Sequence, residues 1–205
     1  MHISQPKKDF FANKAKEYDQ KISTRNNVSN IASCILKEVN YSKNMHLMDF
    51  GSGTGLLLTE IAPHVNSITA VDVSKSMTAI LKEKRNEIDC SLKIREIDLT
   101  KETINTTFDG IISSMTLHHI KDTKGILQKF YTLLKTDGSI ALSDLDSEDG
   151  SFHTEDTGVF HFGFNRDTIL QIAKSVGFRE LKIQTVGNIE KPHGNYGVFL
   201  LTGKK

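Results

Sequence analysis

Apolar positions along this chain follow two periods, and their succession predicts an α/β fold. Short apolar runs typical of buried parallel strands occur at 47–50, 67–72, 92–98, 108–115 and 139–144. Helical spacing separates or precedes these runs, most clearly at Val28, Ile31, Ala32, Ile35, Leu36 and Val39. Two further strands are expected around 181–186 and 196–202. Strands alternating with helices in this way predict a doubly wound, seven-stranded sheet with helices on both faces.

Polar residues at the ends of the helical segments predict where several helices begin and end. Ser74 precedes a helix expected from Lys75 to about Ile88, Asp122 precedes the next, and Asn165 precedes the last. Gly177 follows the last helical position and is expected to stop that helix. Residues 135–138 are expected to form the turn before the fifth strand.

Composition restricts the class of protein. The 205 residues contain 38% hydrophobic residues and no Pro-, Gly- or Ser-rich linker, which predicts one domain over 1–205. A net charge of +1 gives no global electrostatic signal for nucleic acid or an anionic membrane. Cys34 and Cys90 have no metal-ligand spacing, and no apolar leader or membrane-length run occurs. A cytoplasmic protein without a membrane segment is expected.

The strongest chemical signal is a glycine-rich turn directly after the first predicted strand. Residues 49–55 read Asp-Phe-Gly-Ser-Gly-Thr-Gly, with Gly51, Gly53 and Gly55 at alternate positions. Such glycines let the backbone approach a ligand closely, and a ligand lying against the backbone is the expected reason for all three. The spacing does not match the dinucleotide pattern G-x-G-x-x-G, and the phosphate-binding G-K-[ST] is absent.

The D-x-G-x-G-x-G pattern resembles motif I of the class I S-adenosylmethionine-dependent methyltransferases. Asp72 lies 17 positions beyond Gly55 at the end of a strand, where the resemblance implies an acid that binds the ribose. Met77 would pack on adenine, Asp98 would accept from the adenine amino group, and the backbone of Leu99 would donate to the ring. The implied cofactor-binding residues are Asp49, Gly51, Ser52, Gly53, Gly55, Asp72, Val73, Met77, Asp98, Leu99, Ser114 and Met115.

The same resemblance implies a Rossmann-like, mostly parallel sheet with an antiparallel last strand. It also implies S-adenosylmethionine as cofactor and S-adenosylhomocysteine as product. Within the domain, 45–145 would form the cofactor-binding core, 1–44 a helical segment covering the cofactor site, and 165–205 the last helix and strands. Ordinary helix packing is an alternative reading for Met77.

Segments 10–19 and 146–164 are candidates for the acceptor side. The first resembles the segment that, in small-molecule methyltransferases, folds over the cofactor, and it makes Tyr18 a catalytic candidate; the alternative is an aromatic anchor of a surface helix. The second contains four phenylalanines, two histidines and five carboxylates, a composition that predicts an acceptor-side wall or lid. The alternative is a loop tucked down by its phenylalanines, with solvated histidines.

Histidines supply the candidates for a general base, which methyl transfer from a sulfonium needs only when the acceptor must lose a proton. His119, favoured over His118, and His153 are expected in that role, with core or surface packing as the alternative. A metal bound by His153, Glu155, Asp156 and His161 was weighed on ligand type, but these residues have no recognised spacing, so no metal site is expected.

The acceptor is expected to be a small molecule attacked at O, N or S. Neither the [DNS]-P-P-[YF] motif of exocyclic-amine DNA methyltransferases nor a Pro-Cys nucleophile occurs. Three alternatives remain open: a sensor that binds S-adenosylmethionine without turnover, an RNA or protein methyltransferase, and an aminopropyl transferase. Glu148 and Asp149 are the acidic pair that the last alternative would use.

Overall fold

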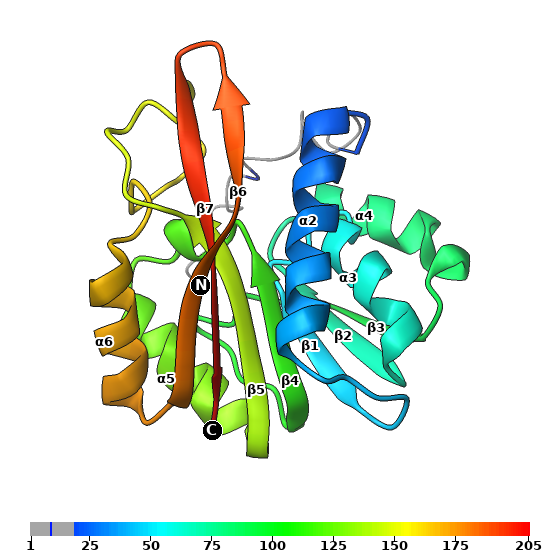
Figure 1. The fold of residues 1–205 in the computed structure, drawn as a ribbon. Helices are drawn as coiled ribbons and strands as arrows, with labels where there is room; N and C mark the ends of the chain where they lie inside the picture. Colours follow the sequence, from blue (N-terminus) through cyan, green and yellow to red (C-terminus); the bar gives the residue numbers. More distant parts are fainter. Residues whose placement is uncertain (1–8, 10–18) are drawn as a thin grey trace, which may run out of the picture.

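The computed structural model describes Asp9 and residues 19–205. Its sheet has seven strands in the order β3-β2-β1-β4-β5-β7-β6 (Figure 1). Neighbouring strands pair in parallel except β7, which runs antiparallel to β5 and β6. The strands are β1 His46–Phe50, β2 Ser67–Asp72, β3 Ser91–Glu96, β4 Phe108–Ser114, β5 Leu134–Leu145, β6 Arg179–Lys191 and β7 Gly194–Lys204. The expected doubly wound, mostly parallel sheet is therefore confirmed.

Helices cover both faces of the sheet and make it the middle of three layers (Figure 1). One apolar cluster joins the sheet to α2 Ile22–Glu38, α3 Leu56–Ile61 and α4 Lys75–Glu83. The other joins it to α5 Thr123–Leu133 and α6 Arg166–Val176. Short 3-10 helices complete the chain: η1 Ala62–His64, η2 Arg85–Glu87 and η3 Leu117–His119.

Strand residues alternate between the two apolar clusters, which explains why the strands read as continuous apolar runs. In β1, Leu47 belongs to the α2 side and Met48 to the α5 side. In β4, Ile112 and Ile111 divide in the same way. Because successive side chains of a strand point to opposite faces, a sheet covered on both sides needs apolar residues at every position.

The predicted helix ends are confirmed by their capping contacts. The side chains of Ser74, Asp122 and Asn165 each accept a hydrogen bond from a backbone N–H in the first turn of the helix that follows. Gly177 ends α6 with a φ of 116°, a conformation that glycine adopts without strain.

Several predicted boundaries are wrong. β5 begins at Leu134, so the expected turn at 135–138 lies inside the strand as an irregularity opposite Phe108 and Gly110. α4 ends at Glu83 and is followed by η2, and β3 ends at Glu96. β6 and β7 extend beyond the expected 181–186 and 196–202 because they pair with each other along a hairpin that projects past the sheet (Figure 1).

The carboxyl ends of β1 to β5 define the functional edge of the sheet. From β1 the chain crosses to β2 on one side, and β4 lies on the other side, so the order of strands reverses between β1 and β4. Ligands of open α/β sheets bind at such a switch point. The 146–164 loop leaves this edge from β5 and is closed at its ends by a bridge between Asp146 and Phe164. Within the described ranges, every helix is too short or too polar to cross a membrane.

Candidate functional site

The three glycines of the turn after β1 differ in what surrounds the position where a side chain would begin. All three have positive φ, at 70°, 53° and 87° for Gly51, Gly53 and Gly55. A Cβ on Gly51 would lie 2.2 Å from Thr116, and one on Gly55 would lie 2.4 Å from Leu81. A Cβ on Gly53 would meet no atom of the described residues within 4 Å. The expectation that only a ligand requires all three glycines is therefore wrong for Gly51 and Gly55, where packing within the protein already excludes a side chain. Gly53 alone faces open space.

Asp72 joins the end of β2 to the glycine turn. Its Oδ2 accepts a hydrogen bond from the backbone N–H of Gly53 at 2.7 Å, and its Oδ1 accepts one from Ser74 at 2.8 Å. Burial raises the pKa of the Asp72 carboxyl, and these backbone hydrogen bonds oppose that shift. Each carboxylate oxygen has a second lone pair, so the side chain can still accept from ribose hydroxyls while it holds the turn in place.

Asp49 is a buried carboxyl at the end of β1. Burial, and secondarily the nearby charge of Asp72, raise its pKa to about 8. Its Oδ2 is one of three buried oxygen atoms around the glycine turn that have no hydrogen-bond partner among the described residues; the others are Oγ of Ser52 and Oγ of Ser114. Because buried polar groups are normally satisfied, this group of oxygens indicates a polar or cationic ligand.

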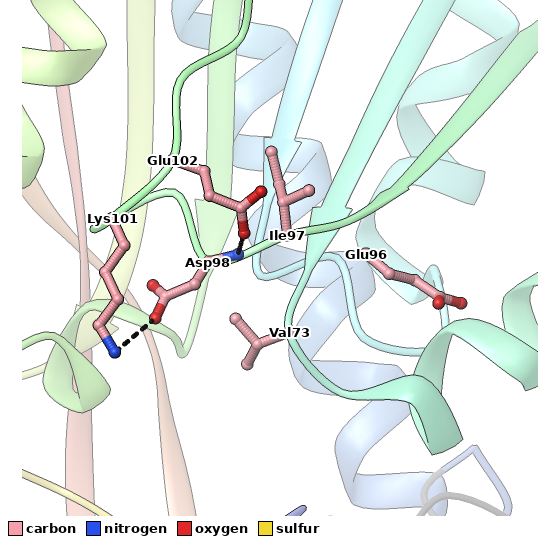
Figure 2. A pocket seen from close by; sticks show the side chains of 6 residues that line it. All are labelled: Val73, Glu96, Ile97, Asp98, Lys101 and Glu102. Atoms are coloured by element: carbon pink, nitrogen blue, oxygen red, sulfur yellow. Dashed lines mark hydrogen bonds and ion pairs between the residues drawn. The ribbon is translucent and has the colours of Figure 1, made fainter. Parts of the chain in front are cut away.

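A cavity of about 300 Å³ lies at the ends of β2 and β3. Its lining residues are Val73, Glu96, Ile97, Asp98, Lys101 and Glu102 (Figure 2). The Asp98 carboxylate accepts from Thr100 and lies 3.6 Å from Nζ of Lys101, so it stabilises its own loop. Leu99 and Met77 are buried, whereas Val73 is 61% exposed. Val73 and Asp98, which follow neighbouring strands, thus line one cavity, and Met77 lies in the first turn of α4.

The chain leaves β4 through a residue with unusual backbone geometry. Met115 has a φ of 55°, a conformation uncommon for residues other than glycine and often found at functional sites. Thr116 then packs against Gly51 and leads into η3. The glycine turn and η3 are therefore in direct contact, which fixes the distance between the expected cofactor site and the histidines that follow.

The N-terminal part of the chain contacts the same edge at two points. Asp9 accepts hydrogen bonds from the hydroxyls of Ser74 and Ser76 at the start of α4. Asp19 accepts from Thr54 in the glycine turn and forms an ion pair with Lys84. Nothing in the local sequence pattern predicted these contacts. The catalytic candidate Tyr18 lies outside the described residues.

Three imidazole rings meet beyond the ends of β4 and β5. Ring centroids of His118 and His119 are 4.2 Å apart, and that of His153 lies 5.2 Å and 5.8 Å from them. His118 is fully buried, and its Nδ1 lies 2.7 Å from Oδ1 of Asp144 at the end of β5. Burial, and then the neighbouring His118, lower the pKa of His119 to about 4.

Two members of this group, His118 and Asp144, were not predicted as site residues from the sequence, which favoured His119 over His118. An acid at the carboxyl end of a strand is a recognisable signal for Asp144, but its partner 26 residues earlier is identified only by the tertiary structure. The candidates His119 and His153 do come together.

The 146–164 loop folds over η3. Backbone N–H groups of Phe160 and His161 both donate to the carbonyl oxygen of His118. Phe152 and Phe164 are buried, as the alternative of a tucked-down loop requires, whereas Phe160 and Phe162 are exposed. The loop therefore lies on the histidine group rather than away from the sheet.

Two alternative uses of this loop fit the structure poorly. His161 contacts the carbonyl oxygen of Ile120 and the hydroxyl of Thr123, and no described metal-ligand group unites it with His153. The Glu148 and Asp149 carboxylates accept hydrogen bonds from the backbone of their own turn. The loop thus does not assemble the metal set that was weighed from the sequence, and this acidic pair holds its own turn.

These residues fit S-adenosylmethionine. Open space over Gly53 leaves room against the backbone, and Asp49, Ser52 and Ser114 offer unsatisfied buried oxygens beside it. The cofactor carries a sulfonium and an α-ammonium, which a buried carboxylate complements. Asp72 presents its carboxylate at the adjoining strand end.

Comparisons with known proteins also identify a methyltransferase. The family model described as a methyltransferase domain matches residues 22–182. An uncharacterized methyltransferase from Schizosaccharomyces pombe is 30% identical over 156 residues, covering 68% of this chain and 55% of that protein. A malonyl-[acyl-carrier protein] O-methyltransferase from Acetivibrio thermocellus is 27% identical over 136 residues, covering 65% of this chain and 47% of that protein. This chain thus spans about half the length of these curated relatives.

Solved structures share the fold. The N-methyltransferase NodS from Bradyrhizobium japonicum, in complex with S-adenosylhomocysteine, superposes with a TM-score of 0.73 at 12% identity, covering 96% of this chain and 94% of that chain. At this identity the similarity concerns the fold alone, and the family rests on the sequence match over 22–182. The chain therefore belongs to the class I S-adenosylmethionine-dependent methyltransferases.

Proposed function

We propose that this chain transfers the methyl group of S-adenosylmethionine to an O, N or S nucleophile of a small molecule. The observation that carries the proposal is the contact between Gly51 and Thr116, which sets an open glycine turn directly beside a group of histidines at one edge of the sheet. Curated and structural relatives include proteins named as O- and N-methyltransferases, so they do not select the attacked atom.

Each part of the cofactor has a proposed partner. Asp72 binds the ribose hydroxyls, and Asp49 faces a cationic group of the methionine part. Gly53 allows the backbone to lie against the ligand, because no side chain in the described part of the protein occupies the space in front of it. The proposed adenine-side residues are Val73, Met77, Asp98 and Leu99; those on the methionine side are Gly51, Ser52, Gly55, Ser114 and Met115.

Positioning is the main task of the protein in this reaction. When bound, S-adenosylmethionine supplies a methyl group already activated by the positive charge of its sulfonium. Residues that hold the nucleophile in line with that methyl replace a bimolecular encounter, an effect that can contribute about 7–11 kcal/mol. As the new bond to the acceptor forms, the carbon–sulfur bond breaks and its electron pair stays on sulfur.

His119 fits the role of a hydrogen-bond acceptor better than that of a strong base. With a pKa of about 4 it stays neutral at physiological pH, but efficient general bases have pKa values near the working pH. We therefore assign to His119 the role of a neutral lone-pair donor beside the acceptor, and not that of the base that removes its proton. His153 and Tyr18 remain the other catalytic candidates.

A cavity of about 280 Å³ is the proposed entrance for the acceptor. Phe152, His153 and Thr157 line it on the loop side, and Lys21 and Lys191 add positive charge. A cavity of this size suits a small molecule or a part of one. The 146–164 loop would then form one wall of the acceptor pocket.

Turnover of the cofactor tests the proposal directly. The purified chain is incubated with methyl-labelled S-adenosylmethionine and fractions of a metabolite extract, and S-adenosylhomocysteine and labelled products are measured by mass spectrometry. A fraction-dependent increase in both is expected. Tight cofactor binding with no product in any fraction, RNA and protein fractions included, would favour a sensor and contradict the proposal.

Cofactor affinity is expected to rise with pH. Asp49 is largely protonated below its pKa of about 8, and a cationic ligand favours its ionised form, so binding lowers this pKa and releases a proton. Affinity should therefore rise by up to about tenfold per pH unit below pH 8 and level off above it. Titration calorimetry at several pH values, in buffers of different ionisation enthalpy, measures both effects. Asp49→Asn should remove the slope, and a slope that persists would assign it to another group.

Separate substitutions of His153 and His161 distinguish a role in the acceptor pocket from a role in holding the loop against the protein. His153→Asn should lower turnover at least about tenfold, equivalent to roughly 1.4 kcal/mol, while cofactor affinity stays within about twofold. His161→Asn removes contacts to Ile120 and Thr123, so it should lower the melting temperature and affect turnover less. Steady-state kinetics and thermal denaturation measure these two effects. Equal effects of the two variants on turnover would contradict separate roles for His153 and His161.

A further inference from the structure

Three histidine side chains from two separate segments converge on one point. His118 and His119 come from η3, and His153 comes from the loop after β5. One ring nitrogen from each lies within 4.8 Å of those of the other two. We propose that His118, His119 and His153 form a binding site for a divalent transition metal of the zinc type, with one coordination position open toward the acceptor cavity.

Each ring is oriented by a partner outside the group. Nδ1 of His118 lies 2.7 Å from the buried Asp144 carboxylate, and Nδ1 of His153 lies 3.0 Å from the hydroxyl of Thr157. His119 is hydrogen-bonded to the backbone of Gly158. Histidines that bind metals almost always use their second nitrogen in this way, and a carboxylate is the most effective partner. In the neutral ring of His118, a hydrogen on Nδ1 leaves the lone pair on Nε2.

The distances are compatible with a metal after small side-chain rotations. Zinc binds imidazole nitrogen at about 2.0–2.1 Å, which places tetrahedral ligand nitrogens about 3.3 Å apart. The three rings already lie side by side with centroids 4.2 to 5.8 Å apart. Nε2 of His153 is buried, so it points into the protein and not to bulk solvent.

The donor set also selects the kind of ion. Three imidazoles favour zinc, copper, nickel or iron, whereas magnesium and calcium prefer oxygen ligands. Each imidazole offers a metal one ring nitrogen while its other nitrogen keeps its hydrogen bond, so the three rings can act as ligands together. Three protein nitrogens leave a fourth position for water or a substrate atom, as in catalytic zinc sites.

Charged residues of both signs lie around the site. Asp144 supports His118 from the buried side, and Glu155 lines the cavity next to His153. Lys21 and Lys191 line the same cavity. Their positive charge disfavours a free cation but complements an anionic ligand in its open position. If the proposed methyl transfer holds, on which this step alone rests, that ligand is the acceptor, whose nucleophilic atom the metal would make easier to deprotonate.

Metal titration tests the site without any need for turnover. Tag-free protein, stripped with a chelator, is titrated with Zn²⁺ by calorimetry and with Co²⁺ by visible absorption. One ion per chain is expected, with a Co²⁺ spectrum typical of four or five ligands and no heat with Mg²⁺. His119→Asn and His153→Asn should each weaken Zn²⁺ binding at least about hundredfold, and Asp144→Asn about 10–100-fold.

Matched controls separate this site from adventitious binding and from misfolding. His64 is exposed in η1, and His64→Asn should bind Zn²⁺ like the unchanged protein. Each variant should keep its melting temperature within a few degrees and bind S-adenosylmethionine normally. No Zn²⁺ binding by the stripped protein, or equal loss in His64→Asn and His119→Asn, overturns the metal site. Because cofactor binding and turnover are measured separately, their failure would instead contradict the proposed methyl transfer.

Discussion

Gly53→Val is expected to abolish S-adenosylmethionine binding while the protein stays folded. The Cβ of residue 53 would point into a space where no atom of Asp9 or residues 19–205 lies within 4 Å, so the valine side chain would fill the place proposed for the cofactor. We expect affinity to fall at least about hundredfold, or roughly 2.7 kcal/mol. Because φ at this position is 53°, the substitution should also cost about 1–3 kcal/mol of stability. Titration calorimetry and thermal denaturation measure the two effects separately.

Gly51→Ala provides the contrasting control. Its Cβ would lie 2.2 Å from the Thr116 side chain, so the main effect should be a large drop in melting temperature. Normal binding by folded Gly53→Val, or the same loss of stability in both variants, would show that the turn is purely structural and would remove the central support for the cofactor site.

Asp72→Ala is expected to weaken binding of S-adenosylmethionine by about 1.5–3 kcal/mol, the range for hydrogen bonds to a charged group. That range corresponds to a loss of roughly 10- to 150-fold, measured by calorimetry. The Asp72 carboxylate also accepts from Gly53 and Ser74, so part of the loss can arise from a looser turn.

A cofactor analogue that lacks a ribose hydroxyl separates these two contributions. The unchanged protein should bind S-adenosylhomocysteine more tightly than its 2′-deoxy or 3′-deoxy analogue, whichever hydroxyl Asp72 accepts from. In Asp72→Ala this difference should disappear, because the partner of the hydroxyl is gone. A difference of the same size in the variant, for both analogues, would show that Asp72 holds only the turn.

Contact between η3 and the glycine turn couples the two halves of the proposed site. Thr116 packs on Gly51, and two residues later His118 binds Asp144 at the end of β5. A shift of η3 would therefore move the histidines relative to the cofactor. Substitutions at Thr116 are therefore expected to change turnover by moving η3.

Local patterns in the sequence were sufficient for a doubly wound α/β sheet, and the resemblance to the class I methyltransferases added the cofactor and the antiparallel last strand. Continuous apolar runs require a sheet covered on both faces, and the capping residues Ser74, Asp122 and Asn165 mark helix starts because they act on backbone groups only a few residues away. Asp49, the glycine turn and Asp72 were likewise recognisable, since each follows directly from a strand end. Boundaries that depend on a distant partner, such as the long β6–β7 hairpin, were not predicted.

Only the tertiary structure showed which of the recognisable residues face a ligand site and which pack against the protein. Whether a glycine makes room for a ligand or for the protein depends on what lies opposite it, and Thr116 and Leu81 come from other parts of the chain. In the same way, His153 reaches His118, which lies 35 positions earlier in the chain. Spacing in a sequence describes local geometry along a helix or strand, whereas side chains on different strand ends meet only after the whole sheet has formed.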